Sequence, residues 1–397
     1  MFVSIRARLD RLLGPDPAAS PDRSRVEHAM RGSRRAADIA EVVEGEDAGG
    51  GTFLVRRGHD VPAEFSEADP RWWAALAREP RWAGARREDV AFLDLETTGL
   101  AGGTGTVAFL IGLARVRDGR LETRQYFLRS PASEAAALAR VEEELRGCTH
   151  LVTFNGKCFD VPLLETRFVM HRRKLVTLPH LDLLHPARRV WKRRLEDCTL
   201  GRLEAEVLGR ARHGDIDGAE IPQRWFDWLA LGDARPLAAV IEHNRLDLVA
   251  LASLAGRLAR LLANPSEAVH ATDLFSLGTM MARDGDSRAE PTLGEALSRG
   301  AREAAPELAR VKKRRGARDE ALPLWEMAAR DPGRRGIEAG VELAKHYEHK
   351  AKDSARALAV TQGLMARGDL TAREREELGK RLHRLDRKRA RTTGGFL

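Results

Sequence analysis

Short apolar or alternating segments between positions 88 and 184 predict a series of β-strands. The Asp118-Gly119 dipeptide between two of them is typical of a tight hairpin turn. A further apolar run, TFLV (52–55), is a possible strand in the preceding region. The expected strands are VAFLDLETT (90–98), VAFLIGLARVR (107–117), ETRQYFLR (122–129), LVTF (151–154) and HLDLL (180–184).

Helices are predicted between the later strands, because apolar residues recur there with helical spacing. The first covers 130–147, with Ser130 or Ser133 as the candidate N-cap. The second begins at Asp160 and has a proline in its first turn, where proline is tolerated. Helical segments continue to about residue 262. A three-strand meander followed by helix, strand, helix, strand and helix matches the ribonuclease-H-like α/β fold, so we expect a mixed five-stranded sheet with flanking helices.

The last third of the chain shows helical patterns without strand-like runs. The segment ARDEALPL (317–324) resembles AKDSARAL (351–358) at an offset of 34 residues, which is the period of tetratricopeptide repeats. The segment LFSLGTMM (274–281) resembles the first helix of such a repeat. An irregular helical bundle is the alternative interpretation.

These patterns divide the chain into five regions. Trp72 and Trp73 in the second region are expected to pack on the next domain rather than to bind a base. The regions are a basic, partly disordered segment (1–50), an N-terminal extension that packs on the next domain (51–87), the ribonuclease-H-like domain (88–262), a helical tetratricopeptide-like domain (265–385) and a basic tail (386–397).

Composition narrows the class of protein. The 397 residues carry 67 Lys and Arg against 59 Asp and Glu, a net charge of +8, which favours a polyanionic partner. An Arg-rich composition without such a partner is the alternative. Three cysteines exclude a disulfide scaffold, and the lack of a CxxC pair argues against a structural zinc site. With no apolar run of membrane-spanning length and no apolar signal-peptide core, we expect a cytoplasmic protein without a membrane partner.

Two carboxylates lie together on the first predicted strand. Asp94 and Glu96 are two residues apart, so their side chains face the same side, while Leu93 and Leu95 face the other. Adjacent carboxylates repel each other, and a divalent cation with oxygen ligands relieves this repulsion. A solvated strand face with two unrelated acids is the alternative.

Two further acids are placed to complete a cluster. Asp160 follows the fourth predicted strand, at the carboxyl edge where sites assemble in α/β sheets. His243 and Asp247 are four residues apart on a predicted helix and therefore share one face. An isolated His–Asp pair at this spacing usually lies on the protein surface without a function. It becomes significant only if Asp247 joins the other three acids.

The motifs DLETTG (94–99), NGKCFD (155–160) and HNRLD (243–247) resemble those of the DEDD, or DnaQ-like, 3′→5′ exonucleases. Longer segments of residues 50–262, including GDIDGAEIP (214–222), are similar to the bacterial YprB-like branch, which often carries C-terminal helical repeats. Three motifs in order, on the predicted elements, are specific together although each is common alone.

The resemblance implies a two-metal phosphodiesterase site. Asp94, Glu96, Asp160 and Asp247 would hold two Mg²⁺ or Mn²⁺ ions, and His243 would deprotonate or orient the attacking water. The family places either Tyr three intervening residues before the last Asp or His four before it. This chain has His with three, which puts the efficiency of the base in doubt rather than the metal binding.

Candidate substrate-binding residues flank these motifs. Thr97 and Gly99 follow the strand carboxylates, and Lys157 could neutralise a phosphate. Asn155 either bonds the phosphate or sugar of the substrate or shapes its turn. Asp182, on the fifth strand, could lie near the site, although its strand more often has a structural role. The basic runs 172–174, 188–194 and 312–315 are each usually solvated; the first two are plausible surfaces for a single strand.

Two functions follow from these features. The first is a metal-dependent 3′→5′ exonuclease acting on single-stranded DNA or RNA, with a possible protein partner bound by the helical repeats. The second is a nucleic-acid-binding or scaffold protein that keeps the fold but has little activity, with the helical repeats recruiting a partner. A scaffold has no need for four mutually repelling carboxylates at one place, so we favour the nuclease.

Overall fold

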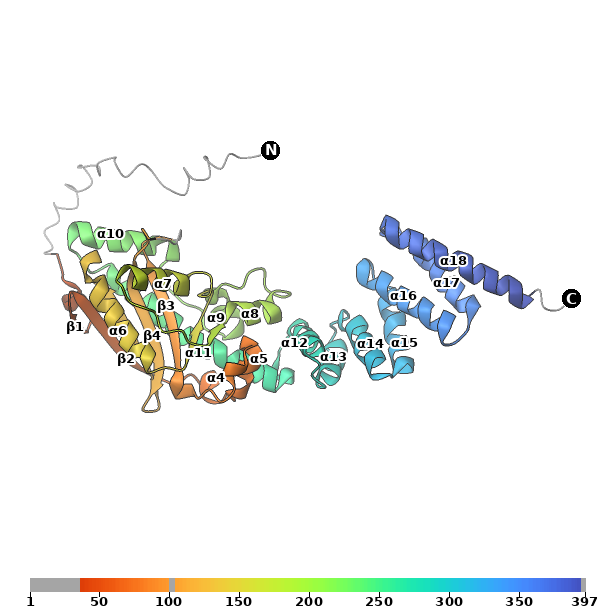
Figure 1. Ribbon diagram of the computed structural model, residues 1–397, viewed down its shortest axis with the longest axis horizontal. Coiled ribbons are helices and arrows are strands. Elements are labelled where there is room, and N and C mark those ends of the chain that lie inside the picture. Colours follow the sequence, from red (N-terminus) through yellow and green to blue (C-terminus); the bar gives the residue numbers. More distant parts are fainter. Residues whose placement is uncertain (1–35, 100–103, 394–397) are drawn as a thin grey trace, which may run out of the picture.

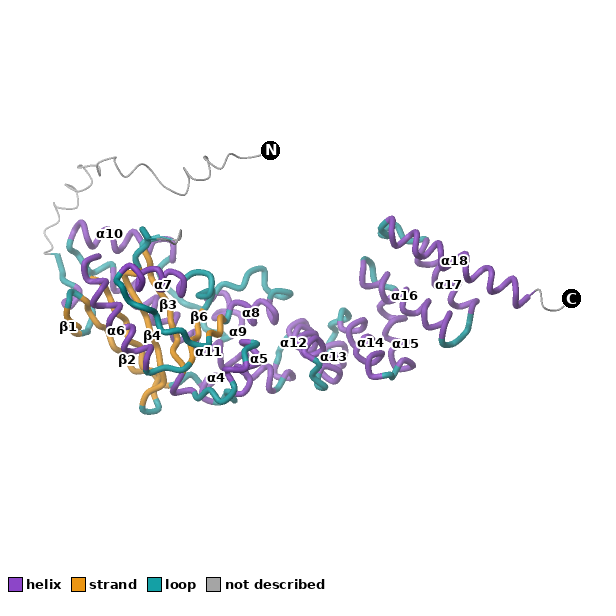
Figure 2. Tube along the Cα trace, in the orientation of Figure 1, coloured by secondary structure: helices purple, strands orange, loops and turns teal. Residues whose placement is uncertain are grey.

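The computed structural model describes residues 36–99 and 104–393. A sheet with its covering helices forms one end of an elongated molecule, and a purely helical region extends from it (Figures 1 and 2). The amphipathic start of the chain and part of the loop at 100–103 lie outside the described residues. No described helix is long and apolar enough to span a membrane.

The sheet has seven strands in the order β1-β2-β5-β4-β3-β6-β7, so the expectation of five is wrong. All neighbouring pairs from β1 to β3 are antiparallel, and β3–β6 and β6–β7 are parallel. The predicted hairpin is present, because Asp118 and Gly119 both have positive φ. The strands are β1 (Glu46–Gly49), β2 (Thr52–Asp60), β3 (Val90–Thr97), β4 (Ala108–Arg117), β5 (Arg120–Leu128), β6 (His150–Thr153) and β7 (His180–Asp182).

The two additional strands come from the N-terminal region. β2 pairs with β5 along its whole length, from Thr52 opposite Leu128 to Asp60 opposite Arg120. Only its first residues are apolar and buried; its second half is polar and partly exposed. β1 has the sequence EDAG, without a large apolar residue, and is held by backbone pairing with β2. Neither segment therefore gave a full strand pattern.

Helices cover both faces of the sheet. Leu93 and Leu95 pack with α6 and α7 on one face, and Phe92 belongs to the core formed with α11 on the other. The helices of this part are α3 (Ile39–Val42), α4 (Ala63–Ser66), α5 (Arg71–Ala77), α6 (Glu134–Arg146), α7 (Asp160–Met170), α8 (Leu184–Trp191), α9 (Leu200–Val207), α10 (Ile221–Leu231) and α11 (Leu237–Ala263), with 3₁₀ helices η1 (Pro80–Trp82), η2 (Arg87–Asp89), η3 (Pro131–Ser133), η4 (Gly218–Glu220) and η5 (Pro265–Glu267).

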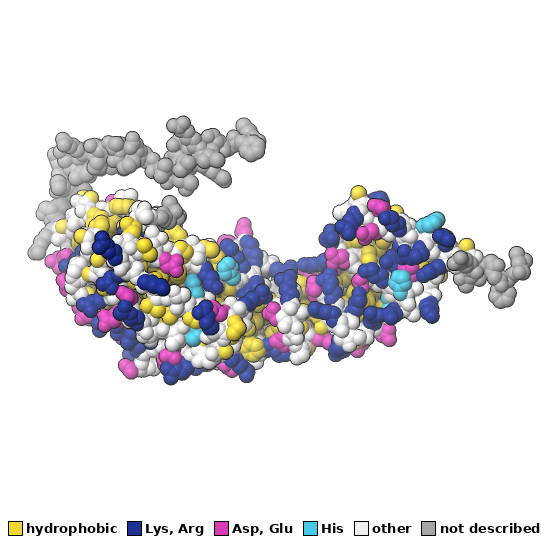
Figure 3. Space-filling view, viewed as in Figure 1, with side chains coloured by type: hydrophobic (Ala, Val, Ile, Leu, Met, Phe, Trp, Pro, Cys, Tyr) yellow, Lys and Arg dark blue, Asp and Glu magenta, His cyan; other side chains and the backbone are white. Residues whose placement is uncertain are grey.

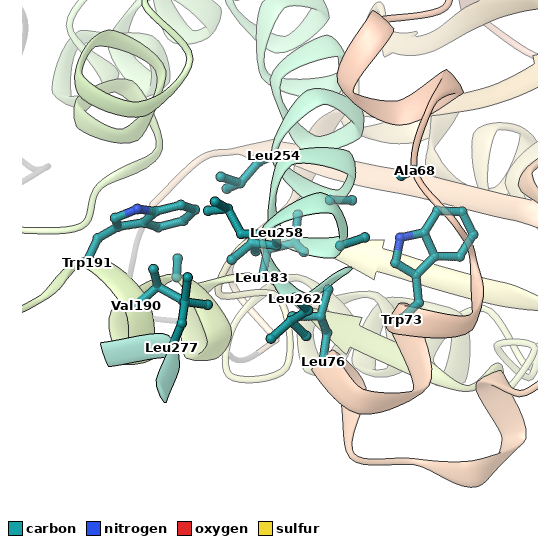
Figure 4. Packing of buried hydrophobic residues seen from close by; sticks show 14 of the residues in the cluster. Ala68, Trp73, Leu76, Leu183, Val190, Trp191, Leu254, Leu258, Leu262 and Leu277 are labelled. Atoms are coloured by element: carbon teal, nitrogen blue, oxygen red, sulfur yellow. The ribbon is translucent and has the colours of Figure 1, made fainter. Parts of the chain in front are cut away.

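One apolar core joins the sheet domain to the helical region. Trp73 packs beside α11, and Trp191 packs with Leu277 of α12 in the same cluster (Figure 4). Trp73 and Trp191 are each 1% exposed, so both are core residues, as expected for Trp73. The two parts of the molecule are thus connected by packing as well as by the chain.

In the helical region, each helix packs against the next one in sequence. α12, α14 and α16 start at Ala271, Ala304 and Arg334, so their spacing is 33 and then 30 residues rather than a constant 34. α18 continues to Thr393, through residues expected to form a tail. The helices are α12 (Ala271–Asp284), α13 (Ala289–Ser298), α14 (Ala304–Arg315), α15 (Arg318–Ala329), α16 (Arg334–His349), α17 (Ser354–Met365) and α18 (Ala372–Thr393).

A buried glutamate fixes the last helix. Glu348 of α16 is 4% exposed and accepts hydrogen bonds from Arg384 at 2.6 Å and Arg381 at 2.5 Å, both on α18. Lys388 of α18 lies 3.3 Å from the same carboxylate. The hydrogen bond from Arg384 lowers the pKa of Glu348 to about 2, although burial opposes this. A charged Glu348 therefore stabilises the folded end of the molecule.

We predict that Glu348→Gln lowers the stability of the helical region by about 2–4 kcal/mol at pH 7. Because the folded pKa is depressed, this contribution is complete above the unfolded pKa and is lost as pH falls from about 4.5 towards 2. Thermal unfolding by circular dichroism should thus separate the variant from the wild type at pH 7 and much less at pH 3. Glu376→Gln, at an exposed pair with Lys380, is the matched control and should have little effect at either pH. A pH-independent difference would contradict the charge-based account.

Candidate functional site

The first two candidate carboxylates lie on β3 in the middle of the sheet. Asp94 and Glu96 share the face of Phe92, towards α11, while Leu93 and Leu95 pack on the opposite side. This confirms the alternation predicted for the strand. Register opposite β4 shifts directly after Glu96, which marks the end of regular pairing at the carboxyl edge.

A buried amide connects Asp94 to α11. Asn244 is fully buried; its Nδ2 donates to Asp94 Oδ2 at 2.8 Å, and its Oδ1 accepts from Gln125 Nε2 of β5 at 2.9 Å. Gly112, opposite Asp94 on β4, makes this approach possible. A Cβ at Gly112 would lie 2.2 Å from Asn244 Oδ1 and 2.9 Å from Leu248. α11 is therefore held close to the sheet beneath the carboxylates.

Asp160 begins α7 and is buried, with 6% exposure. The turn before it is fixed by Asp182 at the end of β7. The carboxylate of Asp182 accepts from the backbone N–H groups of Asn155 at 2.8 Å and Lys157 at 3.1 Å. Asp182 thus lies beside the site, and its role is to hold the turn that presents Asp160.

His180 serves the same architecture. Its Nε2 lies 2.8 Å from Thr153 Oγ1. Burial and the nearby Lys157 lower the pKa of His180 to about 4, so it is neutral at physiological pH. This agrees with the structural role expected for this strand.

His243 and Asp247 lie on one face of α11, as predicted from their spacing, with His243 Nε2 3.6 Å from Asp247 Oδ2. The other ring nitrogen, Nδ1, lies 2.9 Å from both carboxylate oxygens of Asp215. Arg212 from the same loop contacts Asp247 at 2.6 Å and Asp215 at 3.0 Å, and it also pairs with Glu204. One guanidinium is therefore shared by three carboxylates.

The four candidate carboxylates interact electrostatically. Burial and repulsion from Asp247 raise the pKa of Asp94 and of Glu96 well above their usual values. Burial raises the pKa of Asp160 to about 7, and repulsion from Asp182 and then from Asp247 contributes to this. Burial also raises the pKa of Asp247, with opposition from His243 and Arg212. The fold thus brings β3, α7 and α11 together around mutually repelling acids.

Two of these acids interact with other residues of the chain. Asp247 pairs with Arg212, and Asp94 accepts from Asn244. Within the described ranges, no three His, Cys, Asp or Glu side chains are arranged to hold a metal ion together as they stand. β3, α7 and α11 therefore bring the four carboxylates close enough to affect one another's pKa. Their side chains, however, do not converge on one point as predicted.

The donor set nevertheless suits a hard cation. Glu96 and Asp160 are buried carboxylates without an ion pair to any described residue, and unpaired buried carboxylates are costly. A divalent cation with oxygen ligands would offset this cost. The residues present fit Mg²⁺ or Mn²⁺ in their chemistry.

The candidate substrate residues differ in their roles. The hydroxyl of Thr97 donates to the carbonyl of Gly99 at 3.0 Å and so stabilises the turn after β3. Asn155 has a φ of +64°, which supports the turn-shaping interpretation, and its side chain is exposed. Lys157 is also exposed and lies next to the site turn.

Sequence reasoning missed the residues that support the site. Asp215 falls within GDIDGAEIP (214–222), a segment noted only for its family resemblance. Arg212 lies in the irregular segment before it, Glu204 lies on α9, and Asn244 stands between the motif residues His243 and Asp247. Asp215 and His243 are 28 residues apart in the sequence, so no local pattern indicates that they are in contact.

Residues 91–259 match the family model for the RNase_H superfamily, a range that extends from β3 into α11. The chain is also 35% identical over 337 residues to "Uncharacterized protein YprB" of Bacillus subtilis (strain 168). That alignment covers 82% of this chain and 81% of the relative. The expected ribonuclease-H-like fold and the resemblance to YprB are confirmed.

We predict that Gly112→Ala destabilises the protein by about 1–3 kcal/mol, because the new methyl group would overlap buried Asn244 and push α11 away from the sheet. Gly201→Ala on α9 is the control, since nothing lies within 4 Å of its Cβ position; it should be neutral or slightly stabilising. Urea unfolding followed by tryptophan fluorescence measures both. Equal stability of the two variants would show that α11 does not approach the sheet this closely.

Proposed function

Because the chain belongs to the ribonuclease H superfamily, in one family with YprB, we propose that it is a metal-dependent nuclease of the DEDD type. Its reaction is the 3′→5′ exonucleolytic hydrolysis of single-stranded nucleic acid. The observation that supports this most strongly is the gathering of four carboxylates from β3, α7 and α11 close enough to repel one another. Acids that destabilise one another in this way are typical of functional sites.

In this proposal Asp94, Glu96, Asp160 and Asp247 would hold two Mg²⁺ or Mn²⁺ ions. Such ions lower the pKa of bound water and stabilise charge on a phosphodiester. Glu96 and Asp160 are positioned by the end of β3 and the start of α7. Asp247 lies on α11 and forms an ion pair with Arg212, which neutralises its charge. We propose that Arg212 keeps the acidic centre folded by sharing its charge among Asp247, Asp215 and Glu204.

His243 is the proposed base. Its Nδ1 faces Asp215, so its Nε2 is the nitrogen directed to Asp247 and the acidic centre. With a carboxylate at Nδ1, the tautomer protonated there leaves Nε2 free to accept a proton from water. Asp215 is therefore the proposed positioning residue for His243. Lys157, Asn155, Thr97 and Gly99 are proposed to line the path of the terminal nucleotide.

Activity is proposed for residues 88–262, and residues 265–385 are proposed to be tetratricopeptide-like helix pairs. Pairs α12/α13, α14/α15 and α16/α17 each pack closely, which supports this despite the uneven spacing. A protein partner for these helices stays a prediction. The alternative, a scaffold with little activity, is supported by the Arg212–Asp247 ion pair, which ties one essential carboxylate to a protein cation.

We predict Mn²⁺-dependent shortening of 5′-labelled single-stranded DNA or RNA from its 3′ end by the purified chain. Asp94→Asn should lower the rate at least about 100-fold, because it removes one anionic ligand while keeping the hydrogen bond from Asn244. Asp89→Asn, at an exposed pair with Arg86 before the same strand, is the control and should retain activity. Residual activity shared equally by wild type and Asp94→Asn would indicate a contaminating nuclease and contradict the proposal.

We predict that Asp215→Asn lowers kcat about 10- to 100-fold with KM nearly unchanged, because it removes the anion that orients His243. The double variant with His243→Ala should be no slower than His243→Ala alone, since both changes affect one unit. Asp217→Asn, two residues away at the cap of η4, is the matched control. Additive losses in the double variant would assign Asp215 a purely structural role.

A further inference from the structure

A basic recess lies in the helical region, apart from the carboxylate site. It has a volume of about 520 Å³ and is formed by α12, α14 and the start of α15. A second recess of about 240 Å³ shares two of its residues, Lys313 and Arg318, so the two form one trough. The cationic residues of the first recess are Arg283, Arg310, Lys313, Arg314 and Arg318, and a single acid, Glu307, lies among them.

Three of these cations have no carboxylate partner. Arg310 pairs with Glu307 and Lys313 pairs with Glu342. Arg314 donates only to the backbone carbonyl of Ala282, at 3.3 Å. Arg283 and Arg318 form no ion pair with any residue in the described part of the chain. Most other exposed arginines of this region are neutralised, as Arg334 is by Glu338 and Arg373 by Glu377. The trough is therefore a place of uncompensated positive charge.

The sheet domain supplies no excess of positive charge for binding. Residues 36–264 contain 34 acidic and 32 basic side chains, whereas residues 265–393 contain 21 acidic and 27 basic ones. Most of this excess lies in α18, so the trough is distinguished by its unpaired cations rather than by the net charge of its own helices. In the space-filling view, Lys and Arg gather along the hollow between the sheet domain and the end of the helical region (Figure 3). An acidic centre on a nearly neutral domain attracts a polyanion poorly, so the charge needed for binding lies elsewhere.

We propose that this trough binds the phosphate backbone of a single-stranded nucleic acid. This rests on the proposed function, since the strand would be the one whose 3′ end lies at the carboxylates. Guanidinium groups bind phosphate oxygens through paired hydrogen bonds, and three helices present them here from separate positions. No large apolar side chain lines the first recess, and Trp325, which lines the second, is only 2% exposed. The trough therefore presents little of the apolar surface on which protein interfaces depend.

The test is binding of a fluorescent single-stranded 25-mer to the full-length chain in EDTA, measured by anisotropy at several salt concentrations. The triple variant R283A/R314A/R318A should bind at least about 10-fold more weakly. The slope of log K against log salt concentration should fall in magnitude by about two, as expected for three lost phosphate contacts. The matched control, R356A/R373A/K380A, removes three ion-paired, exposed cations and should bind as the wild type does. R283K/R314K/R318K should retain part of the affinity, which separates charge from folding.

Equal affinity of the trough variant and the control would overturn the proposal. So would a trough variant that loses binding to polyglutamate or to anionic lipid vesicles while keeping its affinity for the oligonucleotide, because the trough would then serve another polyanion. Binding in EDTA is independent of cleavage. If the chain has no nuclease activity, the binding result can still be interpreted. If the trough does not bind the oligonucleotide, the activity test is unaffected.

Discussion

The contact between α11 and the central strands is the constraint on which the candidate site depends. Gly112 has no side chain, so Asn244 reaches Asp94 and connects it to Gln125 through a buried chain of hydrogen bonds. The same helix carries His243 and Asp247. Its distance from the sheet therefore decides whether acids from three elements interact. It also forms, through its second half, the core that joins α12 to the sheet domain.

Electrostatics explains why the residues around the acids matter as much as the acids. Four neighbouring carboxylates, two buried and two half-buried, oppose folding unless positive charge or hydrogen bonds compensate them. Arg212 supplies one such charge at Asp247, and Asp215 in turn is bound by both Arg212 and His243. Burial raises the pKa of Asp215, but these hydrogen bonds lower it overall, so Asp215 remains an anion beside the histidine. The loop at 212–215 thus links the charge state of the acids to the orientation of the candidate base.

The sequence pattern predicted the features that depend on neighbouring residues, namely which side of a strand or helix a side chain faces. Alternation placed Asp94 and Glu96 on one face, and helical spacing placed His243 beside Asp247, as the structure confirms. β1 and β2 were missed or only partly predicted because backbone pairing, rather than an apolar pattern, holds their polar residues in the sheet. Arg212 and Asp215 were missed because their importance arises from contacts distant in sequence. The helix starts in the last third of the chain are unevenly spaced, because packing between successive helices does not require a constant period, so the 34-residue resemblance stays a prediction.

The central claim is that these four acids form one divalent-cation site, and Mn²⁺ titration followed by electron paramagnetic resonance tests it most directly. The account predicts saturable binding to the full-length wild type, accompanied by a higher melting temperature. Asp160→Asn should weaken that binding at least about 10-fold, because it removes the charge of a buried carboxylate that Asp247 repels. Absence of saturable binding at millimolar Mn²⁺, or equal binding by wild type and Asp160→Asn, would contradict it.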